Sequence, residues 1–444
     1  MKRVLVSIVA ATMMMGMASA QELSKKESKG QPYFRSSLTM VLMEDPNMDP
    51  EIAGTVRSTF ESAVAPKKFN DHNIDGFRYF TPGETASEED LKLFEEVNPV
   101  QKESFGKAFG KGLLSLATKK EDGSGDVAAY LEEQKRITRE FGALAYKYLI
   151  EQEMPYRVME KWFPVMEGEH SMAMVQERCY NSLTPTEVER ISSAVDHEAQ
   201  ILKISDELIK NTFIVVSRYR YMTANEFAEE IAKEADAVSG GLGFGGLVNS
   251  VTAMTQSNDK HSYVVAVRSF LFQLEWNEEA ENNVAANLKN PDGFKNIPFK
   301  LKYIGQEKSQ ASVGKGGDQK EMSNDEIVAA ATLRAFDKAI AKLEKKYEQF
   351  HVKTPLVTVD PEFTAEIGTY ESVEGKDKYE ILEQRINDKT GRVEYVRKGV
   401  LTVDPKKIWD NDPESEKYQP EGATVLTGKV KDVLPGSLIR RTKK

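Results

Sequence analysis

Hydrophobic residues recur along this chain with two different periods, and the changes of period predict its elements. Apolar or β-branched runs typical of strands lie at residues 37–43, 212–216, 262–276 and 299–304. Between them the spacing becomes three to four residues, which indicates helices that bury one face, above all across residues 85–208. This mixture predicts a sheet domain with a large helical section.

Capping residues mark where the predicted helices begin. Asp49 followed by Pro50 starts a helix that ends before Pro66, and the capping box at Thr184 opens another. We expect this second helix to continue to Leu208. Its buried stripe would consist of Val188, Ile191, Val195, Leu202 and Leu208.

The clearest amphipathic helix begins at the cap Ser323 and ends before Pro355. Its apolar positions alternate between spacings of four and three: Ala329, Leu333, Phe336, Ile340, Leu343, Tyr347 and Phe350. Such spacing suits a coiled-coil seam or a helix laid across a sheet, and the short repeat favours the sheet. The preceding residues 306–319 are rich in Gly, Ser and Lys, which predicts a surface loop.

After Thr354–Pro355 the chain consists of short strand-like segments separated by turn residues. Residues 378–382 and 392–396 flank Asn387–Gly391 and predict a hairpin, and further strands are expected at 399–403, 424–427 and 437–440. Five or six short strands avoid exposed edges best by closing into a barrel. The predicted fold class is therefore α+β: a mixed α/β sheet domain with a large helical section, followed by a small SH3-like β-barrel.

The N-terminus has the pattern of a Sec-type signal peptide. The basic pair Lys2–Arg3 precedes an apolar run that reaches Met17, and Ala18–Ser19–Ala20 supplies the small residues of a cleavage site. The run is too short to span a bilayer, so it predicts export without an anchor. No later stretch is long and apolar enough to cross a membrane, which leaves peripheral contact with a membrane open.

These signals divide the chain into four parts. Residues 1–20 are expected to be the signal peptide and the polar residues 21–31 a flexible lead. The α/β domain would occupy residues 32–354, with its helical section at about 85–208, and the small β-barrel residues 355–444.

Charge and cysteine content narrow the function classes. Sixty basic against seventy acidic residues give a net charge of -10, which argues against general nucleic-acid binding and against attachment to anionic lipid by charge. Cys179 is the single cysteine, so neither an internal disulfide nor a zinc site built on cysteine pairs is expected. A lone cysteine is most often a small buried apolar residue.

No catalytic signature stands out. Gly241–Gly246 matches the glycine string of dinucleotide-binding turns but follows a helix instead of a strand, so no nucleotide cofactor is expected. The apolar, Gly-rich segment Ser239–Met254, which contains Gly240–Gly246, is either a mobile crossover loop or an insertion into a membrane or partner. The five histidines are dispersed, and Ile201 occupies the position where a zincin helix beginning at His197 needs its second His. We therefore assign no catalytic residue, metal or cofactor.

One cluster is a candidate binding site. Arg218 and Arg220 alternate with Tyr219 and Tyr221 on a strand that emerges from the core. Two guanidinium groups on one face of a strand are able to bind a carboxylate or a phosphate. Arginines that extend from a strand end to solvent, beside tyrosines in the core, explain the same pattern without a ligand.

Three stretches are similar to known families. Glu326–Pro355, followed by a barrel segment with Ile408–Asn411, resembles uncharacterised exported envelope proteins of the Bacteroidetes type. The strand Phe213–Val216 and its following helix look like the α/β domain of curli-channel and penicillin-binding-protein-activator families. The stretch Ile367–Leu382 is similar to the small barrel that ends flagellar assembly protein T. These resemblances imply a non-enzymatic part of a Gram-negative envelope assembly.

The sequence thus favours an exported, non-catalytic envelope protein that binds or scaffolds a protein partner. It would act in the periplasm, at the outer membrane or outside the cell. One alternative is a secreted hydrolase whose acidic residues are dispersed along the chain. Another is a protein that binds a small ligand or glycan on aromatic platforms such as Trp276 or Trp409.

Overall fold

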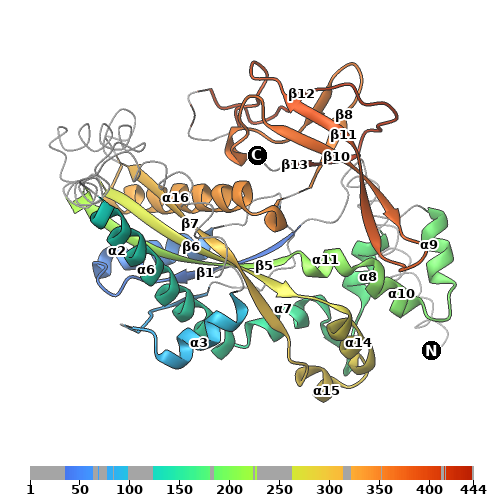
Figure 1. Cartoon of the computed structure of the whole chain (residues 1–444), viewed down its shortest axis with the longest axis horizontal. Coiled ribbons are helices and arrows are strands. Elements are labelled where there is room, and N and C mark those ends of the chain that lie inside the picture. The colour runs from blue at the N-terminus through green and yellow to red at the C-terminus, as the bar shows by residue number, and fades with distance from the viewer. Residues whose placement is uncertain are drawn as a thin grey trace, which may run out of the picture. The chain divides into compact units, whose positions relative to one another are not determined.

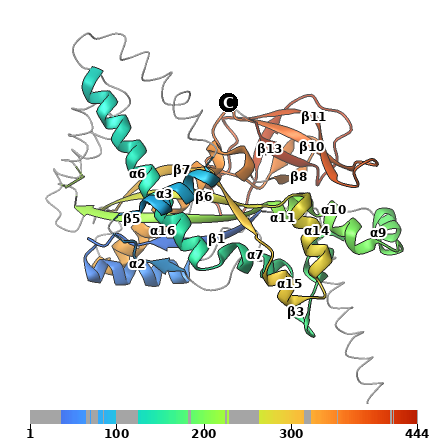
Figure 2. The ribbon, with the colours of Figure 1, turned by 60° about the horizontal axis from the view of Figure 1, so that its bottom comes forward.

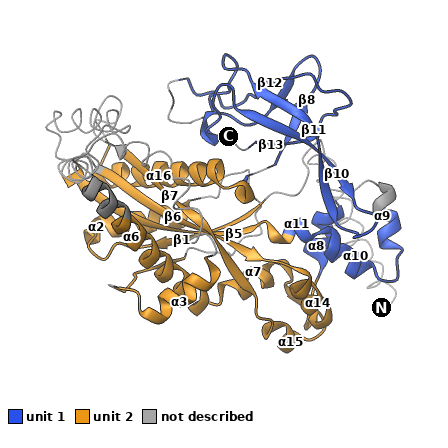
Figure 3. Cartoon of the chain, in the orientation of Figure 1, with its two compact units in different colours: residues 1–35, 172–208, 351–444 blue, residues 36–171, 209–350 orange. Residues whose placement is uncertain are grey.

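The computed structural model describes residues 36–63, 69, 78–83, 85–98, 124–180, 185–223, 226–227, 263–313, 322–351, 353–411, 415 and 417–442. They belong to two compact units (Figure 3). The sheet unit comprises residues 36–171 and 209–350, and the barrel unit includes residues 172–208 and 351–444. Both units combine segments that are distant in the sequence. The expected boundary near Thr354 lies close to the point where the chain returns to the barrel unit.

A five-stranded mixed sheet forms the centre of the sheet unit (Figure 1). Its strand order is β2-β1-β5-β6-β7, with β1 parallel to β2 and β5 and the other neighbours antiparallel. The strands are β1 (Ser37–Met43), β2 (Tyr79–Phe80), β5 (Thr212–Thr223), β6 (Tyr263–Glu275) and β7 (Lys300–Val313). The predicted strands at 37–43 and 262–276 are confirmed as β1 and β6.

Helices cover both faces of this sheet (Figure 2). α2 (Pro50–Ser62) and α16 (Asn324–Lys346) lie on one face, and α3 (Glu88–Val97) and α6 (Ser124–Glu151) lie on the other. Alternation along the strands separates the two sets of contacts. Ser309 of β7 donates a hydrogen bond of 3.1 Å to the Ala335 carbonyl of α16, whereas Phe272 of β6 stacks against Tyr146 of α6.

The predicted starts of α2 and α16 are confirmed. The Asp49 carboxylate accepts the first backbone N–H groups of α2, and Ser323 forms a capping box with Glu326 at the start of α16. α16 packs on β6 and β7, which confirms the prediction of a helix laid across a sheet instead of a coiled-coil seam. Leu333 of the predicted apolar stripe is 41% exposed, however. The buried face is centred instead on small residues that allow a close approach to the sheet: Ala331, Thr332, Ala335 and Ala339.

The predicted surface loop at residues 306–319 is wrong in its first half, because β7 continues to Val313. Glycine, serine and lysine content suggested a loop, but the alternation of these residues fits a strand with one buried face. Ser309 and Ala311 are buried, whereas Lys308 is exposed and Gln306 is half-buried. A change of register at Gly305 marks a bulge in β7.

The sheet unit also contains several short elements. They are α7 (Met154–Trp162), β3 (Val165–Met166), β4 (Glu169–His170), α14 (Glu278–Asn287), α15 (Pro291–Lys295) and the 3₁₀ helix η3 (Glu348–Phe350). Aromatic side chains join several of them: Phe163 after α7 contacts Phe294 of α15 and Trp276 after β6.

The barrel unit contains a closed six-stranded barrel in the order β10-β11-β12-β9-β8-β13, which confirms the predicted small barrel. Its strands are β8 (Thr354–Thr358), β9 (Phe363–Ala365), β10 (Lys378–Ile386), β11 (Val393–Val403), β12 (Thr424–Thr427) and β13 (Leu438–Arg441), with the 3₁₀ helix η4 (Thr369–Glu371). Its core includes Leu356, Ile381, Leu401, Leu426 and Ile439. The predicted hairpin around Asn387–Gly391 joins β10 to β11.

A helical segment also belongs to the barrel unit: α8 (Ala173–Tyr180), α9 (Pro185–Ser192), α10 (His197–Ile204) and the start of α11 (Asp206–Lys210). The predicted continuous helix to Leu208 is therefore wrong. α9 ends at Ser192, and residues 193–196 form a turn before α10 begins at His197. Val195 is fully exposed in this turn.

Ion pairs join this segment to two cations of the barrel: Lys353, which precedes β8, and Arg392, which precedes β11. Arg392 pairs with Asp206 at 2.8 Å, and Lys353 pairs with Glu207 while its ammonium lies over the Tyr395 ring. Both acids stand in the first turn of α11, where the helix dipole favours negative charge.

Candidate functional site

The four residues predicted as a binding cluster lie on two opposite faces of β5. Tyr219 is completely buried and meets Phe60 of α2 edge to face, with ring centroids 5.7 Å apart. Tyr221 donates a hydrogen bond of 3.2 Å to the Val328 carbonyl of α16 and bonds to Thr332. Burial raises the pKa of both phenols. Tyr219 thus serves the contact of β5 with α2, and Tyr221 the contact of β5 with α16.

The arginines point to the α6 side. Arg218 donates to the Asp45 carboxylate at 3.0 Å, and its guanidinium lies 4.0 Å from the centre of the Phe141 ring. Arg220 is exposed. Arg218 is therefore engaged within the sheet unit, and a ligand site at Arg218 and Arg220 stays a prediction.

A second ion pair lies beside Asp45. The guanidinium of Arg57 makes a two-pronged contact with Glu44, whose carboxylate also accepts a 2.7 Å bond from Thr81. Burial raises the pKa of Glu44, but the bonds from Arg57 and Thr81 outweigh it and hold this pKa below its usual value. This cluster joins α2 to the ends of β1 and β2.

Cys179, Trp276 and Trp409, the other residues considered from the sequence, are buried or half-buried in the fold. Cys179 is buried, as predicted, and burial raises its pKa to about 11. Trp276 is 3% exposed, so it offers no platform for a glycan. Trp409 is half-buried, and its indole N–H donates to the Gln419 carbonyl at 2.9 Å. Gly240–Gly246 lies outside the described residues.

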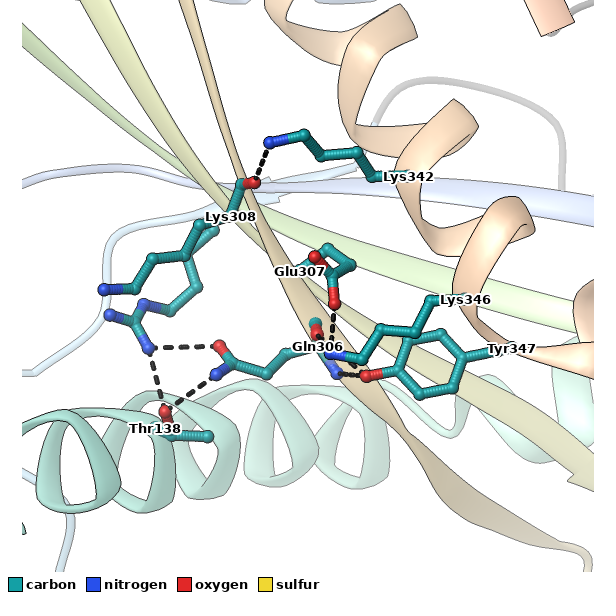
Figure 4. Close-up of polar contacts among 8 residues, drawn as sticks. Thr138, Gln306, Glu307, Lys308, Lys342, Lys346 and Tyr347 are labelled. Carbon is teal, nitrogen blue, oxygen red and sulfur yellow. Dashed lines mark hydrogen bonds and ion pairs between the residues drawn. The ribbon is translucent and has the colours of Figure 1, made fainter. Parts of the chain in front are cut away.

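The edge strand β7 carries a polar cluster that the sequence analysis missed (Figure 4). At the bulge, the Tyr347 hydroxyl accepts a bond from the Gln306 N–H and donates one to the Gln306 carbonyl, both at 2.8 Å. These two backbone groups point away from β6, and Tyr347 satisfies both. Gly305 makes this possible, because a Cβ there would lie 2.2 Å from the Tyr347 hydroxyl oxygen.

Two lysines of α16 continue this cover of the strand edge. Lys342 donates to the Lys308 carbonyl at 2.7 Å, and Lys346 pairs with Glu307 and reaches the Gln306 carbonyl at 3.3 Å. Partial desolvation lowers the pKa of Lys342, although Glu307 opposes this effect. For Lys346 the attraction of Tyr347 and Glu307 outweighs desolvation and raises the pKa. Both ammonium groups are held against backbone acceptors of an edge strand.

Polar residues of α6 complete the cluster on the opposite side of β7. Arg268 of β6 donates to the Thr138 hydroxyl at 2.8 Å and to the Gln306 side chain at 3.0 Å. Gln306 in turn donates to Thr138, and the exposed Lys308 contacts Gln134. The neutral side chains of this group supply no negative charge to the cations.

The β7 edge is therefore basic, in contrast to the acidic chain as a whole. Lys338, Lys342 and Lys346 are exposed at intervals of four residues along α16; we call them the lysine row. Lys308 stands beside it on β7, and Glu307 contributes a carboxylate that pairs with Lys346. The four-residue spacing was visible in the sequence, but it gained significance only once β7 lay next to it.

Other chemistry is sparse in the described part of the chain. Its residues include no group of three or more His, Cys, Asp or Glu side chains placed to hold a metal ion. Within the same residues, no helix has both the length and the apolar character needed to cross a membrane. Neither protein-family models nor curated proteins gave a match when compared with this chain. The family resemblances drawn from sequence patterns therefore stay predictions.

Proposed function

We propose that this chain is an exported, non-catalytic envelope protein that binds or scaffolds a protein partner. The observation that carries the proposal is the lysine row beside the edge strand β7, on a chain whose net charge is -10. Cations concentrated on one face of an acidic protein favour and orient a partner with an acidic surface. The signal-peptide pattern of residues 1–20 supports export to the periplasm, the outer membrane or the cell exterior.

Several carboxyl groups are placed for ion pairs and helix caps. In five of the described carboxyl groups, hydrogen bonds from neighbouring donors outweigh burial and lower the pKa. These groups are Glu44, Asp90, Glu133, Glu326 and Glu383. A general acid for hydrolysis needs a raised pKa instead. The shifted carboxylates of the described residues are suited to ion pairs and helix caps.

The test is crosslinking in intact producing cells, followed by purification through a tag placed after Lys444. The unaltered chain should recover one or two envelope proteins in stoichiometric amounts. The double variant K338E/K342E reverses two charges of the lysine row and should recover less of them. K289E/K295E changes the net charge equally at exposed lysines of the α14–α15 segment and should behave like the unaltered chain. Recovery of the tagged protein alone would contradict the proposal.

A further inference from the structure

The lysine row and the edge of β7 share a repeat distance. Four helical residues rise about 6 Å, and two strand residues rise about 6.8 Å. Lys346 contacts the Gln306 carbonyl and Lys342 contacts the Lys308 carbonyl, so one step of the row corresponds to one two-residue step of the strand. Lys338 is the next step in the same direction. The row thus follows the strand edge at the spacing of alternate residues.

The backbone of β7 has hydrogen-bonding groups directed away from the sheet along this edge. In an antiparallel ladder, residues that point both backbone groups at the neighbouring strand alternate with residues that point both away. The bonds of Gln306 to Tyr347 and of Lys308 to Lys342 identify these residues as the second kind, and Gln310 follows them in the alternation. Lysine and tyrosine side chains, instead of another strand, cover the first two positions. Such cover is a known way to protect a sheet edge.

We propose that β7 accepts an extended, carboxylate-bearing segment of a protein partner as a sixth strand of the sheet. This inference rests on the proposed function and identifies the partner chemistry. Peptide N–H groups of the segment replace Lys342 on the Lys308 carbonyl, and its carboxylates at alternate positions pair with Lys338 and Lys342. Tyr347 closes the edge at Gln306, so the added strand lies along residues 308–313. The main chain supplies affinity and the lysine row selects acidic side chains.

A protein segment fits this edge better than a lipid phosphate does. When Lys342 turns to an incoming anion, the Lys308 carbonyl loses the donor that the structure shows. A peptide brings an N–H group to replace that donor, whereas a phosphodiester only accepts hydrogen bonds. The three lysines also stand in a single file over about 12 Å, which matches a strand with alternating acids more closely than a broad charged surface.

The test uses the purified full chain and the fluorescently labelled peptide (Glu-Thr)4, with fluorescence anisotropy as the readout. Binding is expected, and it should weaken as salt increases. The same peptide with N-methyl groups at alternate residues keeps its charges but loses the N–H groups of one edge. Its affinity should fall at least tenfold. A (Lys-Thr)4 peptide should not bind.

Protein variants separate the lysine row from general charge. K338E/K342E should weaken (Glu-Thr)4 binding at least tenfold, and K289E/K295E less than twofold. Both pairs are exposed, and unchanged thermal unfolding midpoints would exclude loss of fold as the cause.

Three results would overturn the inference: no binding of (Glu-Thr)4, equal binding of the N-methylated peptide, or equal binding to K338E/K342E. If the peptide does not bind but phosphatidylglycerol vesicles bind in a lysine-dependent manner, the lysine row is assigned to a membrane surface instead. If K338E/K342E still recovers its partners from cells, the strand proposal fails while the proposed function stands.

Discussion

Replacing Gly305 by alanine should destabilise the sheet unit, because the space beside this glycine is occupied by Tyr347. An added Cβ would lie 2.2 Å from the hydroxyl oxygen and 2.3 Å from Cζ of that ring, far inside contact distance. The ring must move, and it then gives up its two 2.8 Å bonds to Gln306. Each bond contributes about 1 kcal/mol net. The φ of Gly305 is +157°, a value that residues with a side chain rarely adopt, so backbone strain adds about 1 kcal/mol. We expect G305A to lower the free energy of unfolding by about 3–4 kcal/mol.

A double-mutant cycle with Y347A tests the cause. Once the ring is absent, the Cβ at position 305 meets no obstacle from it and only the backbone strain remains, so the cost of G305A should fall to about 1 kcal/mol. Urea unfolding followed by tryptophan fluorescence is a suitable assay, since Trp162 and Trp276 both lie in the sheet unit. Gly54 is the matched control: it is exposed in α2 with no atom within 4 Å of an added Cβ. G54A should stabilise by roughly 0.5–1 kcal/mol. An equal cost of G305A with and without Tyr347 would refute the steric argument.

Three further predictions concern other parts of the chain. G142A places a Cβ 2.5 Å from the Phe94 ring, so it should lower the urea midpoint of unfolding despite the better helix propensity of alanine. The second substitution F94L should relieve most of this loss. A raised midpoint for G142A would contradict the predicted clash. Cys179 is buried with a pKa raised to about 11, so a thiol-specific dye at pH 8 should label it at least tenfold more slowly in the folded chain than in urea; equal rates would contradict its burial. The folded-state pKa of Glu44 lies below its ordinary value of 4.5 because of Arg57, so its contribution is present at neutral pH and is lost as pH falls through the folded pKa. E44Q should therefore cost about 1–3 kcal/mol at pH 7, and the difference from the unaltered chain should narrow below pH 4.5; a difference that stays constant down to pH 3 would contradict the assignment.

Sequence patterns predicted those elements whose cause is local. The cap Asp49, the capping box Ser323–Glu326 and the continuous apolar run of β6 each act within one element, and each was confirmed. The barrel was predicted because turn residues set the length of each strand. In these places local preference and tertiary structure agree.

Where the sequence analysis failed, the deciding partner lay far away in the chain. Residues 306–313 look like a loop in isolation and form a strand because β6 pairs with them and α16 covers them. Val195 fits a helical stripe by spacing alone, yet it lies exposed in the turn between α9 and α10. Asp45, which lies 173 positions away from Arg218, is a partner that no local pattern in the sequence indicates. The lysine row required knowledge of which strand lies beside α16.

The two-part construction of the barrel unit has a consequence for the order of folding. A polypeptide is made from its N-terminus, so Asp206 and Glu207 exist well before Lys353 and Arg392, the cations that pair with them. More than a hundred residues of the sheet unit are synthesised in between. The helical segment 172–208 is therefore made before either cation that pairs with it. A chain that ended before Lys353 would lack both of these ion pairs, so the contacts that hold α11 to the rest of the barrel unit depend on the last hundred residues of the sequence.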